Sequence, residues 1–177
     1  MYFTKYISPI GELVLASDGK GLTGLWMDGQ KYHGGKILDG ASEKEDVTVF
    51  KEVKRWLDDY FAGRNPSIKG IHLAPIGKEY QQDVWNALCD IPYGETTSYG
   101  RIRDKVAKIQ GNEGLTNRNI GWAVGHNPIS IIIPCHRVVG YDGNLTGYAG
   151  GIERKIQLLE LEGTDMSRLY MPKDRKV

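Results

Sequence analysis

Residues 129–140, Ile-Ser-Ile-Ile-Ile-Pro-Cys-His-Arg-Val-Val-Gly, join an almost wholly apolar run to a thiol, an imidazole and a guanidinium. The run Ile129–Ile133 predicts a buried strand or extended segment. It would deliver Cys135 and His136 from the protein interior to the start of a Gly-rich loop, Gly140–Gly151. A free cysteine is mostly an unreactive thiol at neutral pH, so nucleophilic use of Cys135 needs a neighbouring base or a positive field.

His136 is the immediate neighbour of Cys135 and the first candidate for that base. Adjacent side chains of an extended chain point to opposite sides, so a tight turn or a bridging water would have to connect the two. A histidine in this role needs a carboxylate on its second ring nitrogen. Glu162, at the end of the last expected helix, is favoured for this over Asp142 and Glu160.

Composition sets broad limits on the function. The chain has 177 residues, of which 40% are hydrophobic and 25% charged, as in a globular protein of one large or two small domains. The net charge of +1 does not indicate a polyanionic partner for the chain as a whole. From Arg101 to Arg137, six Lys or Arg stand against two acidic residues, a modest basic patch that a solvated helix face explains equally well.

The two cysteines, Cys89 and Cys135, form no close-spaced pair, which argues against a disulfide framework and favours a reducing compartment. Cys89 lies in an amphipathic pattern, where a structural role is expected, since a lone cysteine is more often a small buried hydrophobic residue. No apolar run reaches signal or membrane-span length, so a cytoplasmic protein is expected. The four histidines form no HExxH motif, and no metal site is expected.

The first third of the chain predicts an antiparallel β-meander followed by one helix. The β-prone runs, separated by turn signals, are Tyr2–Ile7, Glu12–Ser17 and Leu22–Trp26. A Gly-rich loop is expected over Gln30–Ser42, and an amphipathic helix over about 45–61. The connector Arg64–Pro75 would hold at most one strand. We place the domain boundary at its end, which gives domains of residues 1–75 and 76–177.

The second domain is expected to be mainly helical. The predicted helices are Lys78–Ile91, a helix from a Thr97 or Ser98 cap to Ile109, Thr116–Val124 stopped by Gly125, and Glu153–Leu161. Ile102, Val106 and Ile109 would form the inner face of the second helix. With the polar loop Gln110–Gly114, the second and third helices are compatible with a helix-turn-helix, although most such pairs bind nothing. The polar tail Thr164–Val177 is expected to be partly frayed.

The run Pro134–Val139 resembles the active-site signature of the O6-alkylguanine-DNA alkyltransferases, also called methylated-DNA–protein-cysteine methyltransferases. Flanking segments resemble the same family in the same order. They are Ser8–Leu13, Gly21–Thr23, Ile91–Tyr99, Arg118–Gly121, Asn127–Pro128, Gly147–Gly151 and Leu161–Gly163. The resemblance covers nearly the whole chain and is strongest from about Tyr80 to Gly163. The hexapeptide is specific, and its ordered flanks make a chance match improbable.

The resemblance implies an α+β protein with a small N-terminal β-meander and helix domain of RNase H-like type, and a mainly α-helical C-terminal domain with a helix-turn-helix. It implies DNA repair by direct damage reversal, with minor-groove binding and turning out of the damaged nucleotide. Cys135 would take the alkyl group from O6-alkylguanine, and from O4-alkylthymine, irreversibly and once. The expected partner is double-stranded DNA containing alkylated guanine. No metal, cofactor or membrane is expected, and the protein would be a monomer.

The resemblance also implies catalytic roles for five residues. Cys135 would be the alkyl acceptor, and His136, backed by Glu162, would take its proton through a water. Tyr99 would press on the 3′ phosphate, help to rotate the nucleotide, and donate a hydrogen bond to the leaving guanine. Asn127 would brace the turn that links the recognition helix to the active site.

Further residues are implied in DNA and base binding. Arg118 would fill the gap that the turned-out nucleotide leaves in the duplex. The other implied DNA contacts are Thr116, Asn117, Gly121 and Ala123, besides Tyr99. The base pocket would be formed by Val138, Tyr148, Ala149 and Gly150. The backbone carbonyls of Cys135 and Val138 would bind the guanine amine.

The sequence departs from the family pattern in three places. Ala149 stands where some members have a serine, so only its backbone N–H could face the guanine oxygen. The stretch Val106–Asn117 is longer than in the human protein, which lengthens the turn before the recognition helix. No cysteine precedes Cys89, so the zinc ligands that some members carry in the N-terminal domain are missing.

Three other functions fit parts of the pattern. A non-catalytic binder of alkylated DNA would share the fold, but the alkyltransferase-like proteins replace the nucleophile, typically with tryptophan, and Cys135 argues against this. A cysteine hydrolase built on Cys135 and His136 would turn over an ester or peptide and leaves the basic helices unexplained. A plain helix-turn-helix regulator leaves the Cys-His-Glu set unused.

Overall fold

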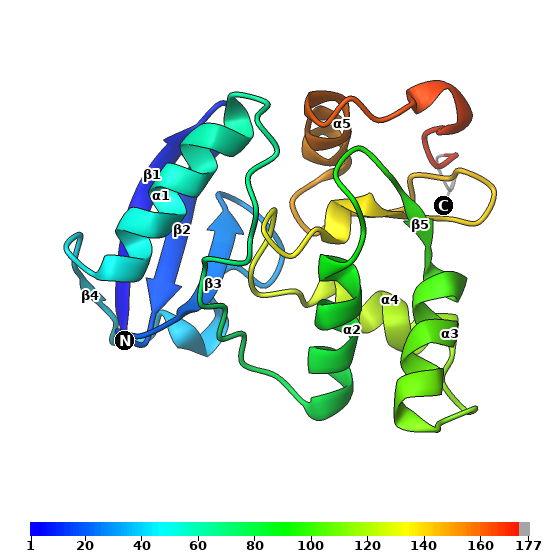
Figure 1. The fold of residues 1–177 in the computed structure, drawn as a ribbon, viewed down its shortest axis with the longest axis horizontal. Helices are drawn as coiled ribbons and strands as arrows, with labels where there is room; N and C mark the ends of the chain where they lie inside the picture. Colours follow the sequence, from blue (N-terminus) through cyan, green and yellow to red (C-terminus); the bar gives the residue numbers. More distant parts are fainter. Residues whose placement is uncertain (174–177) are drawn as a thin grey trace.

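The computed structural model describes residues 1–173, with an N-terminal part built on a sheet beside a C-terminal part built from helices (Figure 1). The sheet has the order β3-β2-β1-β4, and its strands are β1 (Tyr2–Ser8), β2 (Gly11–Ser17), β3 (Leu22–Met27) and β4 (Ser42–Glu43). Both hairpins are antiparallel, which confirms the expected meander to within one residue at each end. The short strand β4 was not expected; it pairs parallel to β1 at the end of the predicted loop.

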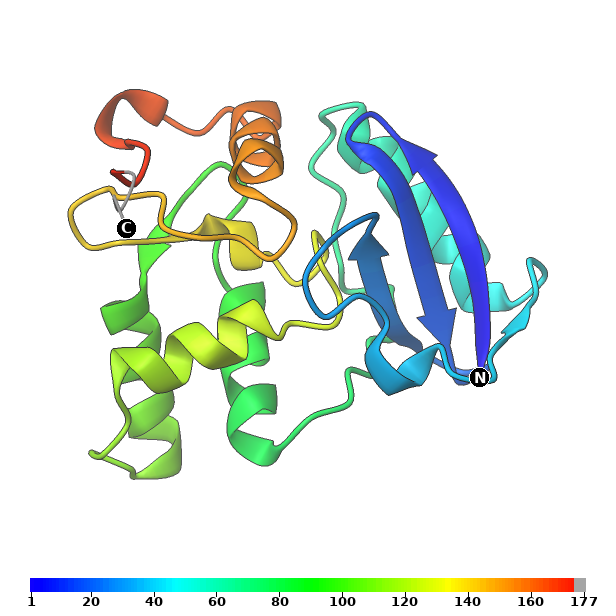
Figure 2. The same cartoon turned by 180° about the vertical axis from the view of Figure 1, so that it is seen from behind.

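Helix α1 (Thr48–Phe61) covers one face of this sheet, and Figure 2 shows the sheet from the opposite side. Its buried face matches the amphipathic pattern, with Phe50, Val53 and Leu57 fully enclosed. The helix begins at Thr48, later than the predicted start near residue 45. The residues just before Val47 are exposed and lie outside the helix. One continuous cluster of buried side chains joins this helix and sheet to the helices of the C-terminal part.

Three helices pack together in the C-terminal part: α2 (Glu79–Cys89), α3 (Tyr99–Gln110) and α4 (Asn117–Gly125). The Ser98 hydroxyl accepts a hydrogen bond from the backbone N–H of Arg101, so Ser98 caps α3. It is one of the two residues that were expected to cap this helix. Thr116 caps α4 in a capping box with Asn119. Gly125 was expected to stop this helix, but it is the last residue of α4. The helix is capped one residue later, at His126.

The predicted inner face of α3 is wrong at one position. Ile102 and Val106 are buried, but Ile109 is 61% exposed. In the last turn of the helix it is Gln110 that faces α2, where its side-chain amide donates to the Asp83 carboxylate at 2.8 Å. This contact leaves Ile109 on the solvent side.

The apolar run before the cysteine is buried as predicted, but it is not a strand. Only Ile129 makes a bridge, to Leu25 of β3. The chain then turns at Ile131, whose φ of 71° is strained for a β-branched residue. No described strand lies beside the rest of the run, so the chain turns and does not continue as a strand. A 3₁₀ turn, η2 (Cys135–Arg137), follows.

A two-stranded parallel sheet was missed by the sequence analysis. It pairs β5 (Thr97–Ser98) with β6 (Val138–Val139) and so joins the start of α3 to the segment that follows the cysteine. Beyond α5 (Ile152–Leu161), the tail forms a 3₁₀ turn, η3 (Met166–Arg168).

The expected fraying of the tail is wrong for its described part. Leu169 packs against a small cluster that contains Val139, Leu145 and Leu159, and a bridge joins Tyr170 to Asn144. The rest of the prediction, residues 174–177, lies outside the described residues. Within residues 1–173, no helix is both long enough and apolar enough to cross a membrane.

Candidate active site and DNA-binding face

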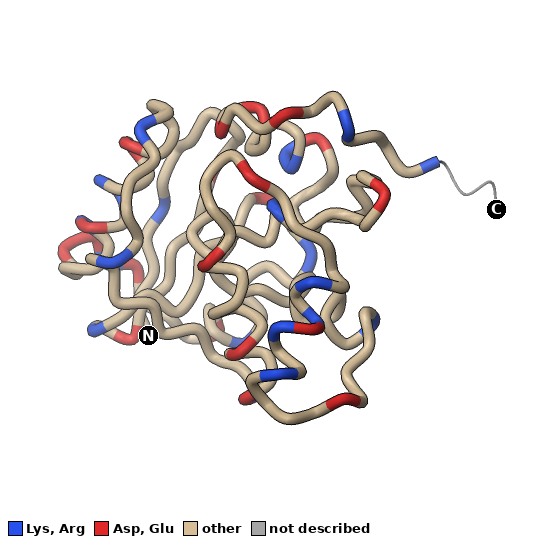
Figure 3. Tube along the Cα trace, turned by 45° about the vertical axis from the view of Figure 1, so that its right-hand side comes forward, with Lys and Arg blue, Asp and Glu red and all other residues tan. Residues whose placement is uncertain are grey.

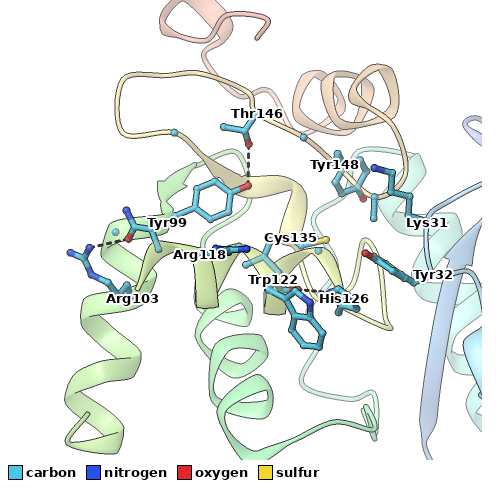
Figure 4. Close-up of a pocket in the computed structure, with 18 of the residues that line it drawn as sticks. Lys31, Tyr32, Tyr99, Arg103, Arg118, Trp122, His126, Cys135, Thr146 and Tyr148 are labelled. Carbon is cyan, nitrogen blue, oxygen red and sulfur yellow. Dashed lines mark hydrogen bonds between the residues drawn. The ribbon is translucent and has the colours of Figure 1, made fainter. Parts of the chain in front are cut away.

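Cys135 lies at the base of a cavity of about 810 Å³, between the helix-turn-helix and the loop that follows β6 (Figure 4). Its side chain is 5% exposed. Two turns position it: an inverse γ-turn at Pro134, in which the backbone N–H of Cys135 donates to the Ile133 carbonyl at 2.8 Å, and the η2 turn, in which the Cys135 carbonyl accepts from the backbone N–H of Val138. Successive side chains of a 3₁₀ turn diverge by about 120°, so Cys135 and His136 do not point to opposite sides as they would in extended chain.

The residue next to the thiol belongs to a buried ionic network. His136 Nε2 lies 2.7 Å from Glu162 Oε1, and both side chains are fully buried. Arg137 donates to both Glu162 oxygens, at 2.8 and 2.9 Å, and to the Ile91 carbonyl. The predicted pairing of His136 with Glu162 is therefore present, and the two less favoured carboxylates, Asp142 and Glu160, lie outside the network.

The charges of this network fix the histidine tautomer. Burial alone would raise the pKa of Glu162, but the hydrogen bonds from His136 and Arg137 outweigh it and lower that pKa to about 2. Burial lowers the pKa of His136, and the hydrogen bond to Glu162 opposes this only in part. An ionised carboxylate only accepts hydrogen bonds, so Nε2 of neutral His136 carries the proton. The other nitrogen, Nδ1, is buried, unprotonated and without a hydrogen-bond partner among the described residues.

The thiol itself is held as the neutral form. Burial raises the pKa of Cys135, and the Asn127 amide and the positive charge of Lys155 reduce this rise. A resting thiol with a raised pKa is a poor nucleophile, so the site needs a base when the target arrives.

Asn127 connects the end of α4 to the cysteine. Its side-chain amide donates to the Ile133 carbonyl at 2.8 Å, and its side-chain oxygen accepts from the backbone N–H of Ile129 at 3.0 Å. These bonds close the turn around Ile131. The geometry agrees with the bracing role that the resemblance implies for Asn127.

The structure adds two residues to the site that the sequence analysis missed. Tyr60 of α1 donates from its hydroxyl to Glu162 Oε1 at 2.8 Å. Lys155 of α5 is 1% exposed, and its ammonium group donates to the carbonyls of Val138, Leu145 and Gly147. A lysine on the apolar side of an amphipathic helix is the one sequence signal that could have indicated the second of these.

Lys155 ties both ends of the loop over the pocket to α5, which gives a first prediction. Replacing Lys155 with methionine removes the donor from three carbonyls, so the free energy of unfolding should fall by about 3 kcal/mol. Urea denaturation would measure this loss. The matched control is Lys51→Met, at an exposed position of α1, and equal stability of the two variants would contradict the role of Lys155.

The cavity brings together seven of the residues that the sequence analysis selected. They are Tyr99, Asn117, Arg118, Gly121, Cys135, Tyr148 and Ala149. Tyr99 opens α3 directly after β5, and its hydroxyl lies 3.0 Å from the Thr146 hydroxyl across the pocket (Figure 4). Arg118 is exposed in the first turn of α4, on the pocket wall.

Two selected residues do not lie where they were expected. Ala123 is fully buried, and its carbonyl accepts a hydrogen bond from the Trp85 indole, so it is not available to DNA. The interior face of α4 packs on α2 at this position. Gly150 does not line the cavity, because it faces Met27 of β3, whose sulfur would lie 2.5 Å from an added Cβ.

Two other selected residues lie next to the site but do not line the cavity. Thr116 is the α4 cap and lies at the helix start, next to the cavity residue Asn117. The Val138 carbonyl accepts from Lys155 Nζ at 2.7 Å, so it shares its oxygen with that lysine.

The basic patch is real but partly neutralised. Basic positions gather around the helix-turn-helix, whereas the two signs are mixed over the N-terminal part (Figure 3). Arg103 pairs with Asp104, and Lys105 pairs with Asp90 at 2.5 Å. Arg101 and Arg118 form no ion pair with a described residue and remain exposed.

The fold and the cavity define a class of protein, in which a buried cysteine opens beside the recognition helix of a helix-turn-helix. The chain belongs to the 6-O-methylguanine DNA methyltransferase family. Residues 1–75 match its ribonuclease-like domain, and residues 79–164 match its DNA binding domain. The RNase H-like expectation for the N-terminal part is thereby confirmed, as is the α+β class.

Curated proteins and solved structures agree with this assignment. The chain is 47% identical over 165 residues to the methylated-DNA–protein-cysteine methyltransferase of Methanosarcina acetivorans, which covers 93% of this chain and 99% of that protein. It is 39% identical over 162 residues to the protein of the same name from Haemophilus influenzae, with 92% and 86% covered. The crystal structure of Mycobacterium tuberculosis OGT in complex with DNA matches with a TM-score of 0.79 and 43% identity, over 96% of this chain and 95% of that one.

Proposed function

We propose that this chain repairs alkylated DNA by transferring the alkyl group of O6-alkylguanine irreversibly to Cys135. The observation that carries the proposal is the placement of a buried thiol at the base of a cavity that the recognition helix α4 also lines. A nucleotide turned out of the duplex at α4 would enter this cavity and meet the sulfur. O4-alkylthymine, which presents a similar alkylated oxygen, is proposed as a second substrate.

The chemistry begins with removal of the thiol proton. His136 Nδ1 takes it through a bridging water, and Glu162 stabilises the resulting imidazolium at Nε2. The thiolate attacks the alkyl carbon, a carbon–sulfur bond forms, and the bond from that carbon to O6 breaks. The electron pair goes to guanine, which takes up one proton from water and leaves, while His136 returns the thiol proton to water. Tyr99 donates a hydrogen bond to the leaving base, with its hydroxyl turned from Thr146.

The pocket holds polar groups suited to a purine. The Tyr148 hydroxyl is buried beside the Cys135 thiol, and it meets the geometry of a hydrogen bond with no described residue. Buried polar groups without partners are costly, so this hydroxyl is a candidate donor to a ring atom of the base. The carbonyls of Cys135 and Val138 are proposed to accept from the guanine amine, and the backbone N–H of Ala149 to face O6.

The product on sulfur is a thioether, which no group in the pocket can reverse. One protein molecule would therefore repair one lesion. The test is a mass measurement on the protein after exposure to a duplex that contains one O6-methylguanine. The expected result is the gain of one methyl group on the peptide that contains Cys135. An unmodified peptide, with the duplex still methylated, would refute alkyl transfer.

Arg118 gives a second prediction. Because its side chain is exposed at the start of α4, it can enter the duplex and occupy the place of the turned-out nucleotide. Arg118→Ala should slow repair of duplex DNA about tenfold or more, while reaction with free O6-methylguanine base changes little. Rates of methyl gain on the two substrates measure this. Equal loss on both would contradict the role.

The competing functions make different predictions. A hydrolase would release product repeatedly from an ester or peptide, whereas an alkyl acceptor stops after one equivalent. A non-catalytic binder would hold alkylated DNA without any change in protein mass. Family membership and the presence of Cys135 at the pocket favour the acceptor over both.

Three further statements are part of the proposal. The chain consists of domains of residues 1–75 and residues 76–177, with the nucleophile and the helix-turn-helix in the second domain. The protein works as a monomer in the cytoplasm, where its thiol stays reduced. DNA affinity falls as salt rises, because phosphate contacts release counterions.

A further inference from the structure

Three aromatic rings form a continuous stack at the mouth of the cavity. The His126 ring stacks on Trp122 with centroids 3.8 Å apart, and on its other side with Tyr32, at 4.0 Å. All three residues line the cavity that contains Cys135 (Figure 4). Trp122, His126 and Tyr32 are called the aromatic stack below.

The stack continues the exposed face of the recognition helix. Arg118 and Trp122 are four residues apart in α4, so they lie on one side of the helix, and His126, the residue that caps its C-terminal end, follows four residues later. Tyr32 then extends this line from the C-terminal end of α4 onto the N-terminal domain. The line begins at the residue proposed to enter the duplex and crosses the domain boundary.

The exposure of Trp122 is unusual among the tryptophans of this chain. The side chain of Trp122 is 49% exposed, while Trp26, Trp56 and Trp85 are 2%, 8% and 2% exposed. Tyr32 is 61% exposed. The domain core therefore does not account for the two outer rings, whose large apolar faces remain open to solvent beside a DNA-binding helix.

The backbone around Tyr32 is also held in place at some cost. Tyr32 has a φ of 58°, a conformation that non-glycine residues seldom adopt and that marks functional sites. The preceding residue, Lys31, donates its backbone N–H to the Ala149 carbonyl at 3.0 Å, which ties this loop to the loop over the pocket. Lys31 is exposed and also lines the cavity, so it adds a positive charge at the pocket.

We infer that the aromatic stack is a nucleobase-stacking surface, through which the N-terminal domain takes part in binding duplex DNA next to the turned-out nucleotide. Open aromatic faces stack on unstacked bases of any sequence, and turning out a nucleotide leaves unstacked base faces beside the gap in the duplex. A neighbouring cation favours the phosphate backbone. The aromatic stack continues the face of α4 that begins at Arg118. Because Arg118 is proposed to enter the duplex, DNA is the molecule expected to bind this surface. The inference rests on the DNA-binding face proposed above and adds to it a contribution from residues 1–75.

The decisive variant is Tyr32→Ala, because Tyr32 lies outside the helix-turn-helix. Duplex affinity would be measured by fluorescence anisotropy in a Cys135→Ala background, with a labelled duplex that contains one O6-methylguanine. Tyr32→Ala should weaken binding roughly fivefold or more, the lower end of the effect of losing one stacked base. Tyr32→Phe keeps the ring and should bind within about twofold of the parent. Ile7→Ala, at a 75% exposed apolar position of β1, is the matched control.

Trp122 provides a second, direct readout. As the one tryptophan of the four that is more than 8% exposed, it should dominate quenching of the intrinsic fluorescence by acrylamide. Addition of duplex DNA should protect it, and Trp122→Phe should abolish the change. This protection from acrylamide is measured on the wild-type protein with duplex DNA. The mass of the same sample is then measured to test for methyl gain.

The outcomes separate this inference from the proposed function. Unchanged affinity of Tyr32→Ala, or a loss in Tyr32→Ala and Tyr32→Phe that follows a loss of thermal stability, would overturn the stacking role. Methyl gain on Cys135 would stand in either case, because it is measured on the unaltered protein. Failure of methyl gain with DNA binding and Trp122 protection intact would overturn the alkyl-transfer proposal alone.

Discussion

Replacement of Cys135 by alanine is expected to abolish methyl gain completely while duplex binding persists. In the proposed reaction its sulfur forms the new bond, and no other described thiol lines the cavity. Loss of one buried sulfur leaves a small cavity and should cost about 1 kcal/mol of stability, which the fold tolerates. Intact-protein mass after exposure to O6-methylguanine duplex measures the first effect, and anisotropy measures the second.

The matched control is Cys89→Ala. Cys89 ends α2, away from the pocket, and burial raises the pKa of its thiol to about 11. This variant should gain one methyl group at the rate of the parent. Methyl gain by the Cys135→Ala protein, or its loss in Cys89→Ala, would show that the acceptor had been assigned to the wrong residue.

The sequence was informative wherever a residue's role depends on its near neighbours. The β-meander follows from three short runs between turns. The pairing of His136 with Glu162, which are 26 positions apart, is the exception, because it was expected from the carboxylate that a histidine base needs. The helix caps at Ser98 and Thr116 are equally local, because each cap bonds a backbone N–H three residues on.

The features that were missed depend on long-range contacts. The pairing of β5 with β6 joins residues about 40 positions apart, and Tyr60 reaches Glu162 across 102 positions. Neither segment carries a periodic signal for its partner. The turn at Ile131 was missed for a related reason: an apolar run predicts burial, but whether it is extended depends on the presence of a neighbouring strand.

The same long-range contacts show why the N-terminal domain belongs to the functional unit. Its helix α1 supplies Tyr60 to the ionic network, and its loop after β3 supplies Lys31 and Tyr32 to the pocket mouth. Leu25 of β3 also pairs with the segment that leads to Cys135, through Pro128 and Ser130. A boundary at residue 75 separates the sequence segments, but the buried core and the site cross it.

Replacement of Glu162 by alanine should have the largest effect on stability. Glu162 is the common partner of His136, Arg137 and Tyr60, and its side chain is fully buried. Removing it leaves the largely buried guanidinium of Arg137, whose side chain is 11% exposed, without its counter-ion, which costs about 3 kcal/mol. It also removes the group that orients His136, so methyl gain by the protein that remains folded should slow by about a hundredfold or more. Glu160→Ala, on the same helix but exposed, is the matched control for both measurements.

The pH dependence of stability tests the same network through its charge. The pKa of Glu162 is lowered from 4.5 to about 2, so the folded protein binds fewer protons than the unfolded chain between those values. The ion pair therefore contributes its full stability above about pH 4.5 and loses it as the pH falls toward 2. Glu162→Gln, which keeps the shape without the charge, should reduce the dependence of the urea midpoint on pH in this interval. If the urea midpoint of Glu162→Gln depends on pH as steeply as that of the parent protein, other carboxylates cause the dependence. Glu162 would then not carry the charge that is proposed to keep Nδ1 of His136 ready to accept the thiol proton.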